Sequence, residues 1–489
     1  MGVLDTLGTD QVFYYFEEIS KIPHGSGNEA ALAEYLMNFA RQHGLIARKD
    51  DANNVIIKKS ASKGYESASA VILQGHLDMV CEKNADTIHD FTKDAIPLQI
   101  DGDFITAKGT TLGGDDGIAV AYMMALLAHP TLEHPALECV FTTDEETGME
   151  GVRALDTSDL TGKYLLNLDS EEEGKFLISS SGGRRLKVSL AANRMPKPEQ
   201  ETGFLLRISG LLGGHSGSDI DLGRASANKL MGRLLYALSS ANLPFSLVSV
   251  DGGMFDNAIC REANAVLTIQ PSDAEKAEQL LHQLQKTMYA EYRHAETDIL
   301  ITWEPLREEI TNVFTTETKE NIISLLLLLP YGVESMSLAI PNLVECSSNL
   351  GIVSTKADEI IFENAVRSAV DSRKEALCAK IERIAQLCHA KTESFGDYPG
   401  WINKENSALL ALLQATYQDV TQKEPMSTAI HAGVECSLFA VKMPDLDMIS
   451  LGPDLFDVHT PQERLSISST IRVWEVLKET LRRMKPHQV

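Results

Sequence analysis

The sequence of 489 residues predicts an α/β protein interrupted by an inserted α+β domain. Between residues 55 and 169, short apolar runs typical of strands alternate with helical segments, which indicates an α/β sheet. From about 185 to 390 the pattern changes to two successive blocks, each of strand, helix and strand character, and the last hundred residues return to the first pattern. We therefore expect one domain from residues 1–184 and 391–489, with residues 185–390 inserted into it.

The composition excludes several classes of partner. Acidic residues outnumber basic ones by 69 to 44, and the net charge of −25 repels phosphate backbones, so we expect no nucleic-acid partner. Residues 1–7 lack the pattern of a signal peptide, and the most apolar run, 325–329, is far shorter than the roughly 20 residues of a membrane span. Seven scattered cysteines without a CxxC pair suit a reducing compartment. The sequence predicts a cytoplasmic protein that does not bind membranes.

The first half of the chain carries a histidine and an acid at a strand end. Helices are predicted at 10–22 and 28–43, and strands at 55–58 and 70–75. His76 and Asp78 follow the second strand and, two residues apart, lie on one face of an extended backbone. A histidine here is more often a hydrogen-bonded core or loop residue than a ligand. The pair gains significance only from the acids that follow other strands.

A glycine-rich turn at residues 109–117 precedes an apolar helix that runs to about 129–130. It places Asp115 near a helix N-terminus, where backbone N–H groups stabilise a carboxylate. An N-cap aspartate is one interpretation. A phosphate loop is another, but GxGxxG is absent and the adjacent Asp116 adds a charge that repels phosphate. A metal ligand is the interpretation that we favour.

Two further strands, at 137–143 and 164–168, deliver acids at their ends. The first is followed by Asp144, Glu145 and Glu146, which either form a solvated turn or point to different atoms of one site. The second is followed by Asp169. In α/β sheets the crevice at the carboxyl ends of the strands is the usual site, so we expect these acids to lie near His76.

The remaining elements complete the expected fold. In the insert, helices are predicted at 224–239, 317–329 and 373–389, and strands at 205–208, 349–353 and 365–370. After the insert, helices are predicted at 405–417 and 468–483. His459 lies on a loop between a strand and the last of these helices. It is either a loop histidine or one more ligand.

Together these residues form a mixed set of histidines and carboxylates that suits zinc or manganese. With one bridging carboxylate, five side chains can hold two ions ~3.5–4 Å apart, as in two-metal hydrolases. Asp78 then accepts the free N–H of His76 and fixes its tautomer, and Glu145 is left as the general base. The five expected ligands are His76, Asp115, Glu146, Asp169 and His459.

The same residues resemble the ordered motifs of the co-catalytic zinc exopeptidases, a family that includes carnosinase-like dipeptidases and aminoacylases. The motifs are His76-Leu77-Asp78, Gly114-Asp115-Asp116-Gly117, Asp144-Glu145-Glu146-Thr147-Gly148, Asp169 and His459-Thr460-Pro461. The resemblance implies a di-zinc catalytic domain, a mixed sheet flanked by helices, with an inserted lid domain of two similar blocks. It further implies hydrolysis of dipeptides with a free amino end and a free carboxylate, such as Xaa-His dipeptides, by a zinc-bridging hydroxide.

By position, the resemblance implies that His76, Asp115 and Asp169 hold one ion, while Glu146, His459 and the bridging Asp115 hold the other. The ions are expected to be Zn²⁺, with Mn²⁺ or Co²⁺ as alternatives. A cis peptide is expected between Asp115 and Asp116.

For substrate, the resemblance implies that His215 helps to polarise the scissile carbonyl, and that Asn257, Arg367 and the Gly433 backbone bind the carboxyl end. The lid is also the expected surface of a homodimer. The chain departs from the family pattern at Cys260, where proline is common, and at Gly114, where alanine is common. Both departures concern loop rigidity only.

Two alternatives remain at this level. An N-acyl amino-acid deacylase or a tripeptidase on the same scaffold differs only in contacts to the amino end of the substrate. A metal-free binding protein on a peptidase scaffold predicts the loss of a ligand or of Glu145, and all of these residues are present.

Overall fold

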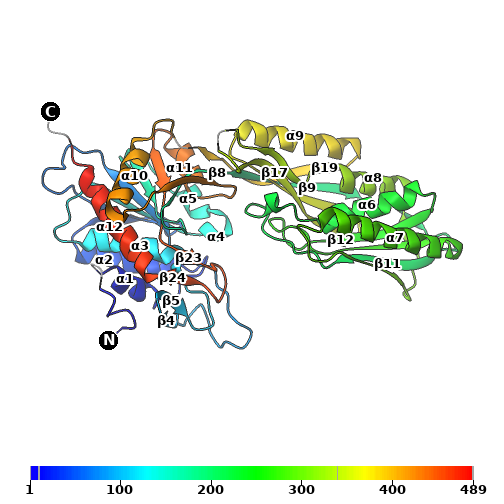
Figure 1. The fold of residues 1–489 in the computed structure, drawn as a ribbon, viewed down its shortest axis with the longest axis horizontal. Helices are drawn as coiled ribbons and strands as arrows, with labels where there is room; N and C mark the ends of the chain where they lie inside the picture. Colours follow the sequence, from blue (N-terminus) through cyan, green and yellow to red (C-terminus); the bar gives the residue numbers. More distant parts are fainter. Residues whose placement is uncertain (1, 9–10, 339, 403, 487–489) are drawn as a thin grey trace. The chain divides into compact units, whose positions relative to one another are not determined.

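The structure is a computed structural model that describes residues 2–8, 11–338, 340–402 and 404–486. The chain divides into two compact units, which can be followed by sequence colour in Figure 1. Unit 1 comprises Met1–Ser179, Trp401–Ala429 and Val434–Val489, and unit 2 comprises Ser180–Gly400 and Ile430–Gly433. Among the described residues, no helix is both long and apolar enough to cross a membrane.

The main sheet of unit 1 is mixed. Its strands are β1 (Ile46–Lys49), β2 (Val55–Lys59), β3 (Val71–His76), β6 (Leu137–Thr142), β7 (Tyr164–Asn167), β8 (Lys175–Ser180), β20 (Trp401–Ile402), β21 (Met426–Ile430) and β22 (Asp447–Ser450). They are ordered β1-β2-β6-β3-β7-β22-β8-β20, and β21 pairs with β8. The central strands β6, β3, β7 and β22 run parallel. Their carboxyl ends therefore meet at one edge of the sheet.

Helices pack around this sheet. They are α1 (Val12–Ile19), α2 (Ala30–Gln42), α3 (Gly114–Ala128), α4 (Glu145–Gly148), α5 (Glu150–Ala154), α10 (Ala408–Thr421), α11 (Cys436–Lys442) and α12 (Ile467–Arg483), several of which are labelled in Figure 1. The apolar sides of α1, α2, α3, α10 and α12 share one core with β3 and β6. Both strands are buried along their whole length, as is typical of central parallel strands.

A smaller four-stranded sheet in unit 1 carries the loop of His459. Its order is β23-β24-β5-β4, from β4 (Leu98–Asp101), β5 (Phe104–Ala107), β23 (Leu455–Phe456) and β24 (Arg464–Ser466). β24 leads directly into α12, whose N-cap Ser466 accepts a hydrogen bond from the Ser469 N–H. Because β23 pairs with β24, and β24 with β5, the loop between β23 and β24 is held at its base.

Unit 2 is built on one antiparallel sheet, ordered β14-β11-β13-β12-β17-β18-β9-β19, with β16 paired to β17. The strands are β9 (Gly182–Ala191), β11 (Thr202–Ser209), β12 (Phe245–Gly252), β13 (Ala263–Ile269), β14 (Leu300–Pro305), β16 (Gly332–Met336), β17 (Val344–Thr355), β18 (Glu359–Ser368) and β19 (Lys391–Tyr398); β10 (Arg194–Pro196) and β15 (Asn312–Phe314) form a separate pair. Within this sheet β12 pairs antiparallel with β17.

Four helices run along the unit 2 sheet in Figure 1: α6 (Ala227–Ser240), α7 (Pro271–Tyr292), α8 (Thr316–Leu328) and α9 (Asp371–Leu387), and a short 3₁₀ turn, η1 (Ile220–Leu222), precedes them. Residues from all four pack with the strands in a second core. The expectation of a mixed α/β sheet and a separate domain is confirmed.

The sequence did not predict α7. This helix is 22 residues long but buries only Ala277, Leu281 and Met288 among those described. An apolar stripe this thin gives little periodic signal, so the helix has to be recognised from Pro271 at its start rather than from its hydrophobic pattern.

Candidate active site

Three parallel strands present their last residues at the same edge of the unit 1 sheet. His76 ends β3, and it lies in register with Thr142, the last residue of β6. On the other side of β3, Gln74 lies in register with Asn167, the last residue of β7. Glu145 and Asp169 therefore follow strands that end beside His76, as the sequence predicted.

The helix α3 approaches this edge closely because Gly75 has no side chain. A Cβ at Gly75 would lie 2.5 Å from Oδ2 of Asp116 and 2.6 Å from Cβ of Ala119. At the start of the helix, Gly113 has a φ of 72°, in the region that favours glycine. The peptide between Asp115 and Asp116 is cis, as the resemblance implied.

Asp115 lies between the two predicted histidines. Its Oδ1 is 3.1 Å from Nε2 of His76, and its Oδ2 is 3.1 Å from Nε2 of His459, although the latter pair is separated by 344 residues in the chain. The two oxygens of one carboxylate thus face two imidazoles, which is the arrangement expected of a bridging ligand.

The other two predicted ligands lie one on each side of Asp115. Oδ1 of Asp169 is 3.5 Å from Nε2 of His76, and Oε1 of Glu146 is 3.0 Å from Nε2 of His459. The structure therefore brings all five predicted ligands together. Donor atoms within 4.8 Å of one another also define three overlapping groups that can hold a cation: His76–Asp116–Asp169, His76–Glu145–Glu146 and Asp115–Glu146–His459.

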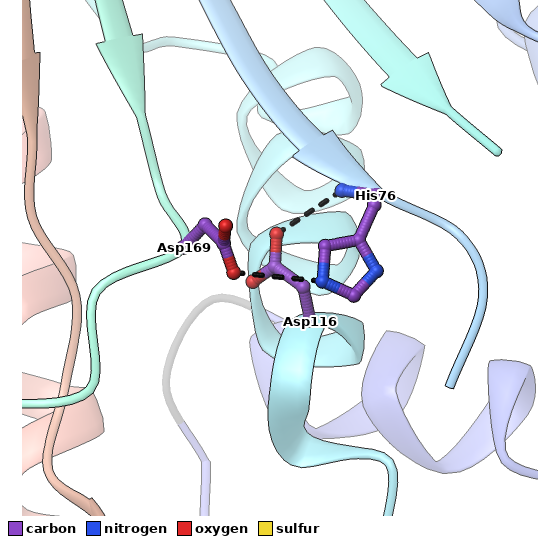
Figure 2. A group of neighbouring side chains, drawn as sticks. All are labelled: His76, Asp116 and Asp169. Atoms are coloured by element: carbon purple, nitrogen blue, oxygen red, sulfur yellow. Dashed lines mark hydrogen bonds and ion pairs between the residues drawn. The ribbon is translucent and has the colours of Figure 1, made fainter. Parts of the chain in front are cut away.

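Asp116 is a site residue to which the sequence analysis gave no role. Its Oδ2 accepts a hydrogen bond from the backbone N–H of His76 at 3.1 Å, and Figure 2 shows its carboxylate beside the imidazole of His76 and the carboxylate of Asp169. Burial, and then the charge of Asp169, raise the pKa of Asp116 well above its ordinary value. Its adjacency to Asp115 was the only signal in the sequence, and adjacency alone does not show which oxygen points into the site.

The pKa values of the site residues are shifted by burial and by their close contacts with one another. Burial raises the pKa of Asp169 to about 6, while hydrogen bonds to Asp115 and Glu146 raise the pKa of His459 to about 11. Burial opposes protonation of His76, yet its carboxylate partners, Asp115 first, raise its pKa well above the ordinary value. Despite burial, hydrogen bonds to the two histidines lower the pKa of Asp115, whereas the pKa values of Asp169, His76 and His459 are all raised. Divalent cations can take the place of the protons on the two imidazoles. The donor set therefore fits a two-cation site.

Asp78 supports the site through backbone contacts. Its Oδ1 accepts from the Glu145 N–H at 3.0 Å, and its Oδ2 accepts from the Glu146 N–H at 3.2 Å and from Oγ of Ser26 at 2.9 Å. The Asp78 carboxylate is 3.5 Å from Nδ1 of His76, whereas the backbone oxygen of Asp78 is only 2.9 Å away. The nearest acceptor for the Nδ1–H of His76 is thus the backbone carbonyl of Asp78. The Asp78 carboxylate mainly holds the start of α4.

Glu145 and Glu146 begin α4, and both extend toward His76. Burial is the largest cause that raises the pKa of Glu145 well above its ordinary value, and the charges of Asp169 and Glu435 add to it. A carboxylate with a raised pKa is suited to accept and return a proton near neutral pH.

The four predicted substrate residues lie in unit 2. Nδ1 of His215 accepts hydrogen bonds from the N–H groups of Gly217 and Ser218, at 3.3 and 3.2 Å, which assigns its ring proton to Nε2. Nη1 of Arg367 donates to Oη of Tyr398 at 3.0 Å. These contacts orient the Nε2–H donor of His215 and the guanidinium of Arg367, both in unit 2.

Asn257 and Gly433 belong to loops of unit 2. Asn257 is exposed, and its backbone oxygen accepts from the Ser216 N–H at 2.8 Å, next to His215. Gly433 ends the segment from Ile430, which is tied to Ser181 by backbone hydrogen bonds. Within that segment, Nε2 of His431 lies 2.7 Å from Oγ of Ser347, on the strand beside Arg367.

Two buried carboxylates escaped the sequence analysis. Glu435, the N-cap residue of α11, is fully buried and accepts hydrogen bonds from Gln74 and Thr142, which lie on the two strands before His76 and Glu145. Glu463 follows His459 by four residues and contacts the turn before Asp115. Their partners are distant in sequence, so no local pattern reveals them.

Comparison with known proteins adds to this geometry. A family model described as peptidase family M20/M25/M40 matches residues 72–483. The chain is 36% identical, over 482 residues, to the cytosol non-specific dipeptidase of Escherichia coli (strain K12), and the match covers 99% of both chains.

Two solved peptidase structures are also similar to this chain. The aminoacylhistidine dipeptidase of Vibrio alginolyticus superposes with a TM-score of 0.88 at 36% identity, covering 99% of each chain. An aminopeptidase from Bacillus cereus ATCC 10987 has a TM-score of 0.58 at 15% identity, covering 98% of this chain and 100% of its own. The latter likeness shows the fold alone.

Proposed function

The chain belongs to peptidase family M20/M25/M40, and from this we propose that it hydrolyses dipeptides that have a free amino end and a free carboxylate, Xaa-His dipeptides among them. It is a metallo-dipeptidase, since relatives 36% identical over 99% of the chain are a cytosol non-specific dipeptidase and an aminoacylhistidine dipeptidase. The sequence resemblance to this group is therefore confirmed. The name of the first relative supports a location in the cytosol.

The observation that carries the proposal is the position of Asp115 between His76 and His459. We propose that His76, Asp115 and Asp169 hold one divalent ion, and that Glu146, His459 and the same Asp115 hold a second. Zn²⁺ suits this mixture of imidazoles and carboxylates, with Mn²⁺ or Co²⁺ as alternatives. Such ions, when bound, polarise a peptide carbonyl and lower the pKa of a coordinated water.

Glu145 is the proposed general base and acid. Its backbone N–H is held by Asp78, and its carboxyl has a raised pKa. It takes a proton from the attacking water and returns it to the nitrogen of the leaving amine. Asp78 keeps both Glu145 and Glu146 in position through one carboxylate, so the base and a neighbouring ligand are oriented together.

Unit 2 supplies the proposed substrate contacts. His215 donates from Nε2 to the carbonyl oxygen, where negative charge develops during attack. Arg367, with Asn257 and the Gly433 backbone, binds the carboxylate of the substrate. A guanidinium that already has one fixed contact loses little freedom when it forms a bidentate pair.

We further propose that residues 185–390 act as a lid, made of two similar blocks, and as the surface of a homodimer.

The test is metal analysis combined with a substrate screen. We expect about two bound ions per chain and turnover of Xaa-His and other dipeptides, with much slower cleavage of tripeptides and N-acetyl amino acids. Faster turnover of N-acetyl amino acids or tripeptides would replace the dipeptidase proposal with a deacylase or a tripeptidase. Tight binding of dipeptides without hydrolysis by the metal-loaded protein would indicate a binding protein.

A further inference from the structure

Glu463 joins the two segments that carry Asp115 and His459. Its side chain is buried, and its residue is only 3% exposed. Oε2 accepts from the N–H groups of Leu112 and Gly113, at 2.8 and 3.1 Å, and Oε1 accepts from those of Gly114 and Asp115, at 2.8 and 3.3 Å. Four consecutive N–H groups, from Leu112 to Asp115 at the start of α3, thus point at one carboxylate.

The loop that carries Glu463 also carries His459, and its shape is fixed by its own hydrogen bonds. The Glu463 N–H donates to the backbone oxygen of Thr460 at 3.1 Å, and Oγ1 of Thr460 donates to the backbone oxygen of Asp457 at 2.7 Å. Glu463 therefore connects a preformed loop to a preformed turn. A shift of either one changes the separation between the Asp115 carboxylate and the His459 imidazole.

Packing beside the carboxylate leaves little room for such a shift. A Cβ at Gly114 would lie 2.6 Å from Cδ2 of Leu455 and 3.2 Å from Oε1 of Glu463. The first residue of α3 is thus packed closely against β23 and against Glu463 in the loop that follows it. Glycine at position 114 permits this close approach.

We infer that Glu463 is a positioning residue that holds Asp115 and His459 at the separation required to share one metal ion. This inference rests on the proposed metal-dependent function. Glu463 does not touch the ion; it acts through the backbone of one ligand and the loop of the other. Loss of Glu463 is therefore expected to weaken mainly the ion bound by Glu146, His459 and Asp115.

The experiment compares Glu463→Gln with Glu138→Gln, a matched control. Glu138 is 4% exposed and also binds a loop, accepting from the N–H groups of Thr161 and Gly162 at 2.9 and 3.0 Å. It lies near the start of β6, at the opposite end of the strand from the site. In Glu463→Gln the amide nitrogen faces two backbone N–H groups in either orientation, because each carboxylate oxygen accepts from two of them. In Glu138→Gln the amide oxygen can keep both loop N–H groups, so the control removes a buried charge without removing hydrogen bonds to ligand segments.

Zinc binding is measured by competition with a chromophoric chelator and by metal analysis after dialysis at fixed free Zn²⁺, and folding is measured by urea unfolding of the metal-free proteins. We expect Glu463→Gln to bind the ion of Glu146, His459 and Asp115 about 10- to 100-fold less tightly than the wild type does. The number of bound ions then falls from about two toward one, while Glu138→Gln retains both ions. Equal zinc binding by Glu463→Gln and wild type would overturn the inference, even if both variants unfold at lower urea.

A second variant covers the case in which Glu463→Gln does not fold. Glu463→Asp keeps both anionic oxygens but withdraws them from the turn, and the same loss of the ion bound by Glu146, His459 and Asp115 is expected. Wild-type affinity in this variant would equally overturn the inference. Failure of the wild-type protein itself to bind two ions or to cleave dipeptides would instead reject the proposed function. The two failures are therefore distinguishable.

Discussion

Asp78→Asn tests whether the carboxylate behind the site organises the ligands. In the wild type, Oδ1 accepts from the Glu145 N–H, and Oδ2 accepts from the Glu146 N–H and from Ser26. An asparagine amide has one acceptor oxygen, so in either orientation its nitrogen faces a backbone N–H. Ser26 can turn its hydroxyl to accept, but neither N–H group can do so.

The expected magnitude follows from that single lost bond. A buried N–H left without an acceptor costs ~1–3 kcal/mol, which corresponds to roughly 5- to 150-fold in a dissociation constant if metal binding must restore the order of α4. Loss of one negative charge near the cations acts in the same direction. We therefore expect Asp78→Asn to bind zinc about 10- to 100-fold more weakly, a range typical of residues that support metal ligands.

The assay is chelator competition with Zn²⁺, with Asp103→Asn as the control. Asp103 also accepts a backbone N–H, from Ser468 at 3.0 Å, and hydroxyl hydrogen bonds from Ser466 and Ser468, but its contacts lie at the start of α12. We expect wild-type zinc affinity in this control. Zinc affinity of Asp78→Asn within twofold of wild type would refute the reasoning, because the lost acceptor would then have no effect on the ligands.

Three further predictions concern the base, a ligand and acid stability. Glu145→Ala should retain both metal ions while peptidase turnover falls about 10²- to 10⁴-fold, and near-normal turnover at intact metal content would reject the assigned base. His459→Ala should lower the zinc content found by metal analysis, and unchanged stoichiometry would remove it from the ligands. Burial, with the charge of Arg367, lowers the pKa of His431 to about 3, so the folded state does not bind the proton that the unfolded state takes up below pH 6.5. The free energy of unfolding therefore falls as pH falls from 6.5 toward 3, by ~2 kcal/mol from this residue at pH 5. Urea unfolding of metal-free His431→Gln should show a shallower acid slope between pH 7 and 5, and an unchanged slope would contradict the pKa of His431.

The strands and most helices could be predicted because their burial is periodic or complete. β3 and β6 are apolar runs buried on both faces, and α12 has a strongly amphipathic pattern that ends in basic residues. α7 could not be predicted in this way, because so few of its residues reach the core. Only a narrow stripe of its side chains packs against the core, so the hydrophobic periodicity of its sequence is weak.

The residues of the candidate site could be named from sequence where each follows a strand or opens a helix. His76, Asp115, Glu145 and Asp169 all occupy such positions, and sheet topology then brings them to one edge. Asp78 was also recognised, but its main contacts with the Glu145 and Glu146 N–H groups depend on the turn into α4. Local sequence predicts which acids are near the site and leaves open which atom each one contacts.

The sequence by itself determined the kinds of donor atom, their order along the chain and the strand ends that present them. Only the tertiary structure decided which donors share a neighbour, since Asp115 meets His459 across 344 residues. It also revealed Asp116, Glu435 and Glu463, whose carboxylates have their partners on other elements. The physical reason is that side-chain type and local backbone preference are encoded in short stretches, whereas distances between donor atoms depend on how whole elements pack.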